Sequence, residues 1–220
     1  MNFKIFLGVG TALMIAVLLF AGKKYELPIW KRFVFALILT GMGVLGTNIM
    51  SFIESGNFFG RSFFGAVLFT PVFMILLGML LRIKPADTLD LCAPAECMML
   101  IFMKINCYIS DCCYGRVMYY SKYGKAMRFP SQIVEGANAV IIMAVLLIML
   151  FMGKQKGKLY AWYLVLYGMS RFALNLLRET RPFIWILPAG NFWALISFVI
   201  GAVWLAIEHK RAVRLKELAP

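Results

Sequence analysis

Four polar side chains recur along the apolar stretch LYGMSRFALNLLRE with the spacing of one helix face. They are Tyr167, Arg171, Asn175 and Arg178, separated by four, four and three residues. At about 100° per residue they fall within roughly an 80° arc, so they form a polar stripe on an otherwise apolar helix. Charged residues inside membrane helices typically line functional cavities, and guanidinium groups suit phosphate. A structural alternative is that Arg178 snorkels to the interface while Arg171 pairs with an acid on a neighbouring helix.

A second group of polar and reactive side chains ends an earlier apolar stretch, MKINCYISDCCYGR. Lys104, Cys107, Tyr108 and Asp111 recur every three or four residues, which predicts one face of a helix. The charge of Lys104 suits the binding of an anion. Pairing of Lys104 with Asp111 is the alternative, and it would make this face a structural device.

A third group opens the next apolar stretch, RFPSQIVEG. Pro130 and Ser131 suit a helix start, where Pro lacks the N–H that would be unpaired and Ser can cap the first turn. We expect Gln132 and Glu135 to point from the first turns toward the region of Lys104. An early acid can also simply face the helix dipole, but Glu135 lies a full turn inside the helix, which favours a functional role.

The thiol groups allow several interpretations. The chain contains Cys92, Cys97, Cys107, Cys112 and Cys113. Zinc sites combine Cys or His pairs two to four residues apart, and the only histidine, His209, lies far away in the tail, so we expect no metal site. A disulfide from Cys107 to Cys112 or Cys113 and close helix packing by small, soft side chains are the remaining alternatives.

The elements that position these groups are membrane helices. Hydrophobic residues make up 62% of the 220 residues and charged residues 15%, and the mean hydropathy of +0.82 is far above that of a soluble domain. One helical crossing of a bilayer core needs roughly 20 apolar residues. Seven such stretches occur: residues 5–21, 33–53, 62–81, 89–109, 133–152, 159–177 and 184–207. We therefore predict an all-α, polytopic protein whose seven transmembrane helices form a single domain over residues 1–220.

Basic residues set the orientation of these helices, because Lys and Arg in short loops stay on the cytoplasmic side. They gather after the first, third, fifth and seventh stretches: Lys23, Lys24, Lys31, Arg32; Arg82, Lys84; Lys154, Lys156, Lys158; Lys210, Arg211, Arg214, Lys216. All four groups share one side if the N-terminus is outside and the C-terminus is cytoplasmic. The net charge of +13 then forms a collar facing anionic lipid, so it gives no support to nucleic-acid binding.

Four further cations lie between the fourth and fifth stretches, on the predicted outer side. They are Arg116, Lys122, Lys125 and Arg128. Short outer loops normally carry few basic residues, so their presence indicates a use. The abundant anion at that depth is a lipid phosphate.

The order and spacing of these segments resemble the prolipoprotein diacylglyceryl transferase family. That family has GRxGNFxNxExxGR before a loop, RHPSQLYE at the start of the next helix and YGxxRFxxExxR on the penultimate helix. This chain has MKINCYISDCCYGR, RFPSQIVEG and LYGMSRFALNLLRE in the same order. The resemblance runs from Ser62, in GRSFFGA, to about Trp204, and it agrees with seven spans and an outer N-terminus.

The family pattern is altered at positions that carry chemistry. The matching positions are Phe64 and Phe129 for two histidines, Lys104 for an arginine, Cys107 for an asparagine, and Cys112 and Asn175 for two glutamates. Lysine keeps the charge of arginine but loses the bidentate fork that suits phosphate. Loss of histidine removes the easiest proton acceptor near pH 7, which leaves Glu135 as the candidate base and Asp111 as a second.

The resemblance implies an enzyme that transfers a diacylglyceryl group from phosphatidylglycerol, or another anionic phospholipid, to a cysteine thiol of a secreted precursor peptide. It also implies a monomer in the bacterial plasma membrane, with no metal and no organic cofactor. Lys104, Glu135 and Arg171 are then the candidate catalytic residues. The candidate substrate-binding residues are Arg116, Arg128, Ser131, Gln132, Tyr167, Asn175 and Arg178. Two alternatives stay open: a catalytically inactive phospholipid-binding relative, and a small membrane transporter or thiol-redox protein.

Overall fold

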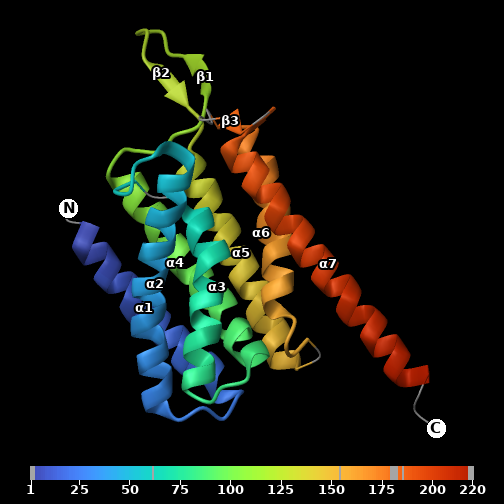
Figure 1. Ribbon diagram of the computed structural model, residues 1–220. Coiled ribbons are helices and arrows are strands. Elements are labelled where there is room, and N and C mark those ends of the chain that lie inside the picture. The colour runs from blue at the N-terminus through green and yellow to red at the C-terminus, as the bar shows by residue number, and fades with distance from the viewer. Residues whose placement is uncertain (1–2, 61, 154, 179–182, 185, 218–220) are drawn as a thin grey trace.

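The computed structural model of the chain describes residues 3–60, 62–153, 155–178, 183–184 and 186–217 (Figure 1). Seven helices make up most of these residues: α1 (Phe3–Lys23), α2 (Ile29–Ser55), α3 (Phe63–Leu80), α4 (Pro85–Ile109), α5 (Ser131–Met152), α6 (Leu159–Asn175) and α7 (Ala189–Glu217). Each predicted stretch coincides with one of them. The predicted all-α class is therefore confirmed for the main part of the fold.

Four of the described helices, α2, α3, α5 and α7, are long and apolar enough to cross a bilayer. The chain is thus a multi-pass membrane protein. The described apolar part of α1 is shorter, α6 has 17 residues and is about 26 Å long, and α4 carries Asp87, Asp90, Glu96 and Lys104. Crossing of the membrane by these three helices stays a prediction.

The start of α7 differs from the prediction. Residues from 184 onward were expected to be helical, but β3 (Phe183–Ile184) pairs with β4 (Leu187–Pro188) in a short antiparallel hairpin. The ring of Pro188 disfavours a helical conformation of the residue before it. The helix therefore begins only at Ala189.

The start of α5 also differs in one detail. Pro130 precedes the helix as predicted, but no side chain caps the first turn. The hydroxyl of Ser131 instead donates a hydrogen bond to the carbonyl oxygen of Cys113. The capping role predicted for Ser131 was wrong, because its side chain holds a preceding loop.

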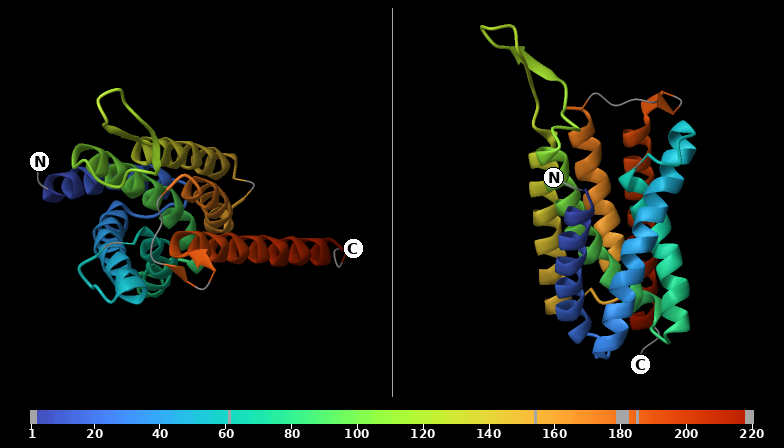
Figure 2. Two further views of the ribbon diagram at one scale, coloured as in Figure 1. Left: turned by 90° about the horizontal axis from the view of Figure 1, so that it is seen from above. Right: turned by 90° about the vertical axis from the view of Figure 1, so that its left-hand side faces the viewer.

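The helices α1 to α6 run up and down side by side, and the last turns of α7 extend away from them (Figure 1, Figure 2). Glycines allow α6 and α7 to pack closely. A Cβ on Gly168 would lie 2.7 Å from the carbonyl oxygen of Ala194, and a Cβ on Gly201 would lie 2.7 Å from that of Ala161. This packing fixes the helix that carries the polar stripe.

The two ends of the bundle differ in character. The α1–α2, α3–α4 and α5–α6 connections and the C-terminal end of α7 lie at one end (Figure 1). These segments carry the four basic groups; Lys154 and the side chain of Lys216 lie outside the described residues. At the other end, the antiparallel hairpin of β1 (Val117–Tyr120) and β2 (Ala126–Arg128) projects beyond the helices. The outer loop predicted between the fourth and fifth stretches is this hairpin.

Candidate functional site

Three cations from two separate segments converge on one carboxylate at the hairpin end of the bundle. The Nζ of Lys104, in α4, lies 2.5 Å from Oε2 of Glu135, in α5. Arg171, in α6, pairs with the same oxygen, and Nη1 of Arg178 donates to Oε1 at 2.9 Å. The Glu135 side chain is only 4% exposed, and those of the cations are 10–19% exposed. The predicted meeting of these segments is therefore observed.

The charges and hydrogen bonds of this cation cluster (Lys104, Arg171 and Arg178 around Glu135) do not balance. Three cations surround one carboxylate, so positive charge is in excess. Within the described residues, the Nε atoms of Arg171 and Arg178 and both polar side-chain atoms of Asn175 are buried without a hydrogen-bond partner. Buried polar groups are normally satisfied. The cluster thus has the charge and the donors to receive an anion.

The polar stripe on α6 is present with one change. The helix ends at Asn175, so Arg178 lies in the turn that follows it. The backbone N–H of Arg178 donates to the carbonyl oxygen of Asn175 at 3.1 Å. Arg171 does pair with an acid on a neighbouring helix, as the structural alternative required. That alternative does not explain why a single acid is shared by three cations.

Tyr167, at the buried start of the stripe, packs among aromatic rings. Its ring centroid lies 5.8 Å from that of Phe63, 5.8 Å from that of Phe64 and 5.6 Å from that of Tyr163. Because Phe64 packs against Tyr167, it faces the helix that carries Arg171. Phe64 stands at the position of a family histidine. An aromatic ring here cannot accept a proton.

A mainly apolar cavity lies between α1, α2, α3 and α4. Its lining includes Met14, Leu39, Phe63, Phe102 and Met103. Phe63 also contacts Tyr167, so the cavity reaches the aromatic group beside the polar stripe. Its walls suit a hydrocarbon chain.

Two other candidate cations lie outside the buried cluster. The side chains of Arg116 and Arg128 are exposed at the base of the β1–β2 hairpin. The backbone N–H of Arg116 donates to the carbonyl oxygen of Leu177 at 3.1 Å. This contact joins the hairpin to the residue before Arg178, so Arg116 lies near the cluster in the chain path although its side chain faces outward.

Asp111 does not share a face with Lys104. The helix α4 ends at Ile109, and Asp111 is exposed with a left-handed φ of 53°. Its carboxylate accepts a hydrogen bond from the hydroxyl of Tyr114 at 2.6 Å. The Lys104–Asp111 ion pair considered from the spacing is replaced by the Lys104–Glu135 pair, because the helical period stops two residues too early.

The first turn of α5 holds the loop that follows α4. The Nε2 of Gln132 donates to the carbonyl oxygen of Cys112 at 2.5 Å, and Ser131 donates to that of Cys113. Gln132 is 1% exposed and its Oε1 makes no hydrogen bond within the described residues. Both residues thus support the loop, and Gln132 retains one free acceptor.

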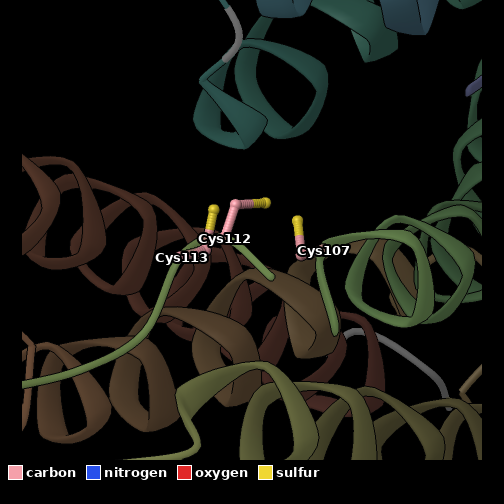
Figure 3. A group of neighbouring side chains, drawn as sticks. All are labelled: Cys107, Cys112 and Cys113. Carbon is pink, nitrogen blue, oxygen red and sulfur yellow. The ribbon is translucent and has the colours of Figure 1, made fainter. Parts of the chain in front are cut away.

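Sequence reasoning missed the group that this loop creates. The sulfur atoms of Cys107, Cys112 and Cys113 all lie within 4.8 Å of one another (Figure 3). The three cysteines are free, so the alternative of a disulfide is not formed. The separation of five and six residues gave no helical signal, because left-handed backbone at Asp111 and Cys113 turns the chain back toward Cys107.

Cys113 is electrostatically linked to the cation cluster. The hydrogen bond from Cys107, together with the nearby charges of Lys104 and Arg178, lowers the pKa of the Cys113 thiol to about 5 although burial opposes this shift. Burial and the neighbouring Cys113 raise the pKa of Cys112. Of Cys112 and Cys113, Cys113 is therefore the thiol that ionises more readily.

Comparison of the sequence with known proteins identifies relatives of this chain. The sequence profile of the family described as prolipoprotein diacylglyceryl transferase matches residues 5–207. Three similar proteins carry the name phosphatidylglycerol–prolipoprotein diacylglyceryl transferase. The one from Teredinibacter turnerae is 28% identical over 157 residues, covering 66% of this chain and 54% of that protein.

The other two are similarly distant. The protein from Clostridium tetani is 25% identical over 134 residues (56% of this chain, 54% of that protein), and the one from Idiomarina loihiensis is 26% identical over 162 residues (69% and 61%). The matched region thus spans between half and two thirds of these relatives. Because the family profile covers nearly all of this sequence, the chain belongs to the prolipoprotein diacylglyceryl transferase family.

Proposed function

We propose that this chain transfers the diacylglyceryl group of phosphatidylglycerol to a cysteine thiol of a secreted precursor peptide. The observation that carries the proposal is the buried cation cluster around Glu135, with its excess positive charge and its unpaired guanidinium donors. An anionic phosphodiester supplies both the charge and the acceptor oxygens that this cluster lacks. The names of the relatives give the same pair of substrates.

In this proposal the acceptor thiolate attacks the glycerol carbon that carries the phosphate. A sulfur–carbon bond forms, the carbon–oxygen bond to the phosphate breaks, and glycerol phosphate leaves with the bonding electrons. Lys104, Arg171 and Arg178 stabilise the departing phosphate. Glu135 is a positioning residue, since both of its oxygens are occupied by cations.

The remaining candidate residues have supporting roles. The buried side chain of Asn175, between Arg171 and Arg178 in the stripe, donates to the phosphate, and Tyr167 packs against the lipid. Ser131 and Gln132 hold the loop of Cys112 and Cys113 beside the acceptor. Arg116 and Arg128 attract anionic headgroups at the membrane surface.

In this proposal the reaction takes place in a membrane. The apolar cavity that reaches Phe63 takes one acyl chain. The protein is a monomeric single domain with seven spans, its hairpin outside and its basic loops in the cytoplasm of a bacterium. This orientation presents the site to precursors that have crossed the plasma membrane.

An assay with labelled phosphatidylglycerol and a cysteine peptide tests the proposal. We expect the purified chain in detergent to release glycerol phosphate and to form a lipidated peptide, and Arg171→Ala to lose both activities. Arg211→Ala is the matched control, because Arg211 is an exposed arginine of α7 that pairs with Glu208. Equal turnover by the Arg171→Ala variant would refute the proposal.

A second candidate function is phospholipid binding without turnover. Phe64 and Phe129 favour it, because they remove two histidines that the family pattern places near this site. In the same assay this candidate predicts binding of phosphatidylglycerol by the unmodified chain and no glycerol phosphate. Repeating the assay with incubation times from minutes to a day distinguishes slow turnover from the absence of turnover.

A further inference from the structure

The cluster of Cys107, Cys112 and Cys113 is not used by the proposed mechanism. Cys107 lies in the last turn of α4, and the other two follow in the loop (Figure 3). The three side chains point to the same side, with all sulfur atoms within 4.8 Å of one another. Sulfur ligands about 2.3 Å from a tetrahedral zinc lie roughly 3.8 Å apart. A small rotation of the exposed side chains of Cys112 and Cys113 closes this difference.

The backbone around these thiols is held in place. The N–H of Cys112 donates to the carbonyl oxygen of Cys107 at 3.0 Å, and α5 fixes the carbonyl groups of Cys112 and Cys113 through Gln132 and Ser131. Hydrogen bonds around the ligand residues help to orient the ligands and are typical of metal sites. The three sulfur ligands therefore need little ordering when an ion binds.

The charge around the thiols is also suitable. Three thiolates on a divalent ion leave one negative charge, and the neighbouring cation cluster has an excess of positive charge. The soft sulfur set selects a thiophilic ion over magnesium or calcium. Asp111, the acid closest in sequence, is engaged with Tyr114, so within the described residues the set has three members.

We propose that Cys107, Cys112 and Cys113 bind a zinc ion whose fourth position receives the thiol of the acceptor peptide. A thiol loses its proton when it coordinates zinc, and at this exposed loop the proton passes to solvent. The ion thereby promotes the loss of the thiol proton. The family pattern has histidines that could accept this proton, whereas this chain has Phe64 and Phe129 at those positions. The part of the inference that concerns the acceptor rests on the proposed transferase function.

The position of the thiol cluster supports this role. Lys104 and Cys107 are three residues apart on α4, about 4.5 Å along the helix axis. A thiolate on the ion therefore lies about one helical turn from the group of cations that would hold the lipid phosphate. This places the attacking sulfur beside the glycerol carbon.

The first test measures metal in the full chain, purified in detergent without chelator. We expect about one zinc per chain by elemental mass spectrometry, loss of that zinc in Cys107→Ser and Cys112→Ser, and retention in Cys92→Ala. Cys92 is a buried cysteine of the same helix and serves as the control. Zinc at background level, zinc that persists in Cys112→Ser, or a disulfide within the trio would overturn the site.

The second test replaces zinc with cobalt and follows the sulfur-to-cobalt absorption. A cysteine peptide is expected to increase this absorption as a fourth thiolate binds, whereas the serine peptide leaves it unchanged. An unchanged spectrum with the cysteine peptide would overturn the acceptor role. If the metal and the peptide thiol bind but no lipidated peptide forms, only the transferase proposal fails; if Cys112→Ser retains full transfer, only the zinc proposal fails.

Discussion

The bundle buries one acid near each end, Asp90 in α4 and Glu135 in α5, and the two are satisfied in different ways. Asp90 accepts hydrogen bonds from the Tyr25 hydroxyl at 2.7 Å and from the backbone N–H groups of Gly157 and Leu159 at 2.5 and 2.9 Å. Its donors are uncharged and come from two interhelical connections and from the first residue of α6. Glu135 is surrounded by three cations instead.

Under the proposed function, this difference separates a structural acid from a functional one. The Asp90 site ties the α1–α2 and α5–α6 connections to α4, and its donors have their partner. At Glu135 the cations outnumber the acid, and donors of Arg171 and Arg178 remain without a partner in the described part of the chain. Burying unbalanced charge costs stability, so it indicates that a ligand completes the site.

The largest expected effect concerns stability. Glu135→Gln removes the carboxylate that pairs with three buried cations, so we expect it to lower the free energy of unfolding by about 3–5 kcal/mol in neutral detergent. Phosphatidylglycerol should restore much of this loss because its phosphate replaces the carboxylate, and phosphatidylcholine should restore less. Denaturant titration in each lipid measures the effect.

Asp90→Asn is the matched variant at the other end. Its loss of roughly 1–3 kcal/mol should be the same in either lipid, because the donors around it are neutral. Identical lipid responses of the two variants would remove the distinction between the two acids.

A smaller effect is expected on turnover. Arg178→Ala should lower the transferase rate about 100-fold, the size of the loss when one donor to a developing anion is removed. Tyr25→Phe should leave the rate within about twofold and cost about 1 kcal/mol of stability. Initial rates of glycerol phosphate release decide this, and a larger rate loss in Tyr25→Phe would contradict the assignment.

A change of a few fold is expected for Lys104→Arg. Guanidinium binds phosphate through two parallel hydrogen bonds where ammonium acts as a point charge. The variant should therefore bind phosphatidylglycerol roughly three- to tenfold more tightly. Titration into lipid-free protein measures the change, and weaker binding would argue against contact between this side chain and the phosphate.

The smallest effect uses Cys113 as a sensor of the cations around Glu135. The reactive form is the thiolate, so with a pKa of about 5 the alkylation rate of Cys113 should stay high from neutral pH down to about pH 5 and fall below it. Cys112, whose pKa is raised, should lose reactivity at a higher pH.

Phosphatidylglycerol should raise the pKa of Cys113, because the phosphate offsets the charges of Lys104 and Arg178. Mass spectrometry of iodoacetamide-treated, metal-free protein follows both cysteines, and a Cys113 profile unaffected by the lipid would place the phosphate elsewhere.

Much of the fold could be predicted from the sequence, because long apolar stretches bounded by charge or Pro have few alternatives to a helix. The start of α7 could not, since residues 183–188 are apolar whether they form strands or a helix. The same holds for the β1–β2 hairpin, whose two strands of four and three residues carry no periodic pattern long enough to detect.

For the site, periodicity predicted the stripe of Tyr167, Arg171 and Asn175 because these residues share one helix. Periodicity could not show that Glu135 pairs with three cations, since these ion pairs depend on how α4, α5 and α6 pack. It also failed beyond Ile109, where a left-handed turn replaces the helix and brings Cys112 and Cys113 back to Cys107.

Lipid binding tests the central claim most directly. Native mass spectrometry of the detergent-solubilised chain with equal amounts of phosphatidylglycerol and phosphatidylcholine measures the preference for an anionic headgroup. We predict a preference for phosphatidylglycerol that is lost in Arg171→Ala and retained in Arg211→Ala. Equal binding of both lipids by the unmodified chain, or a preference that survives in Arg171→Ala, would show that the cations around Glu135 do not form the lipid phosphate site.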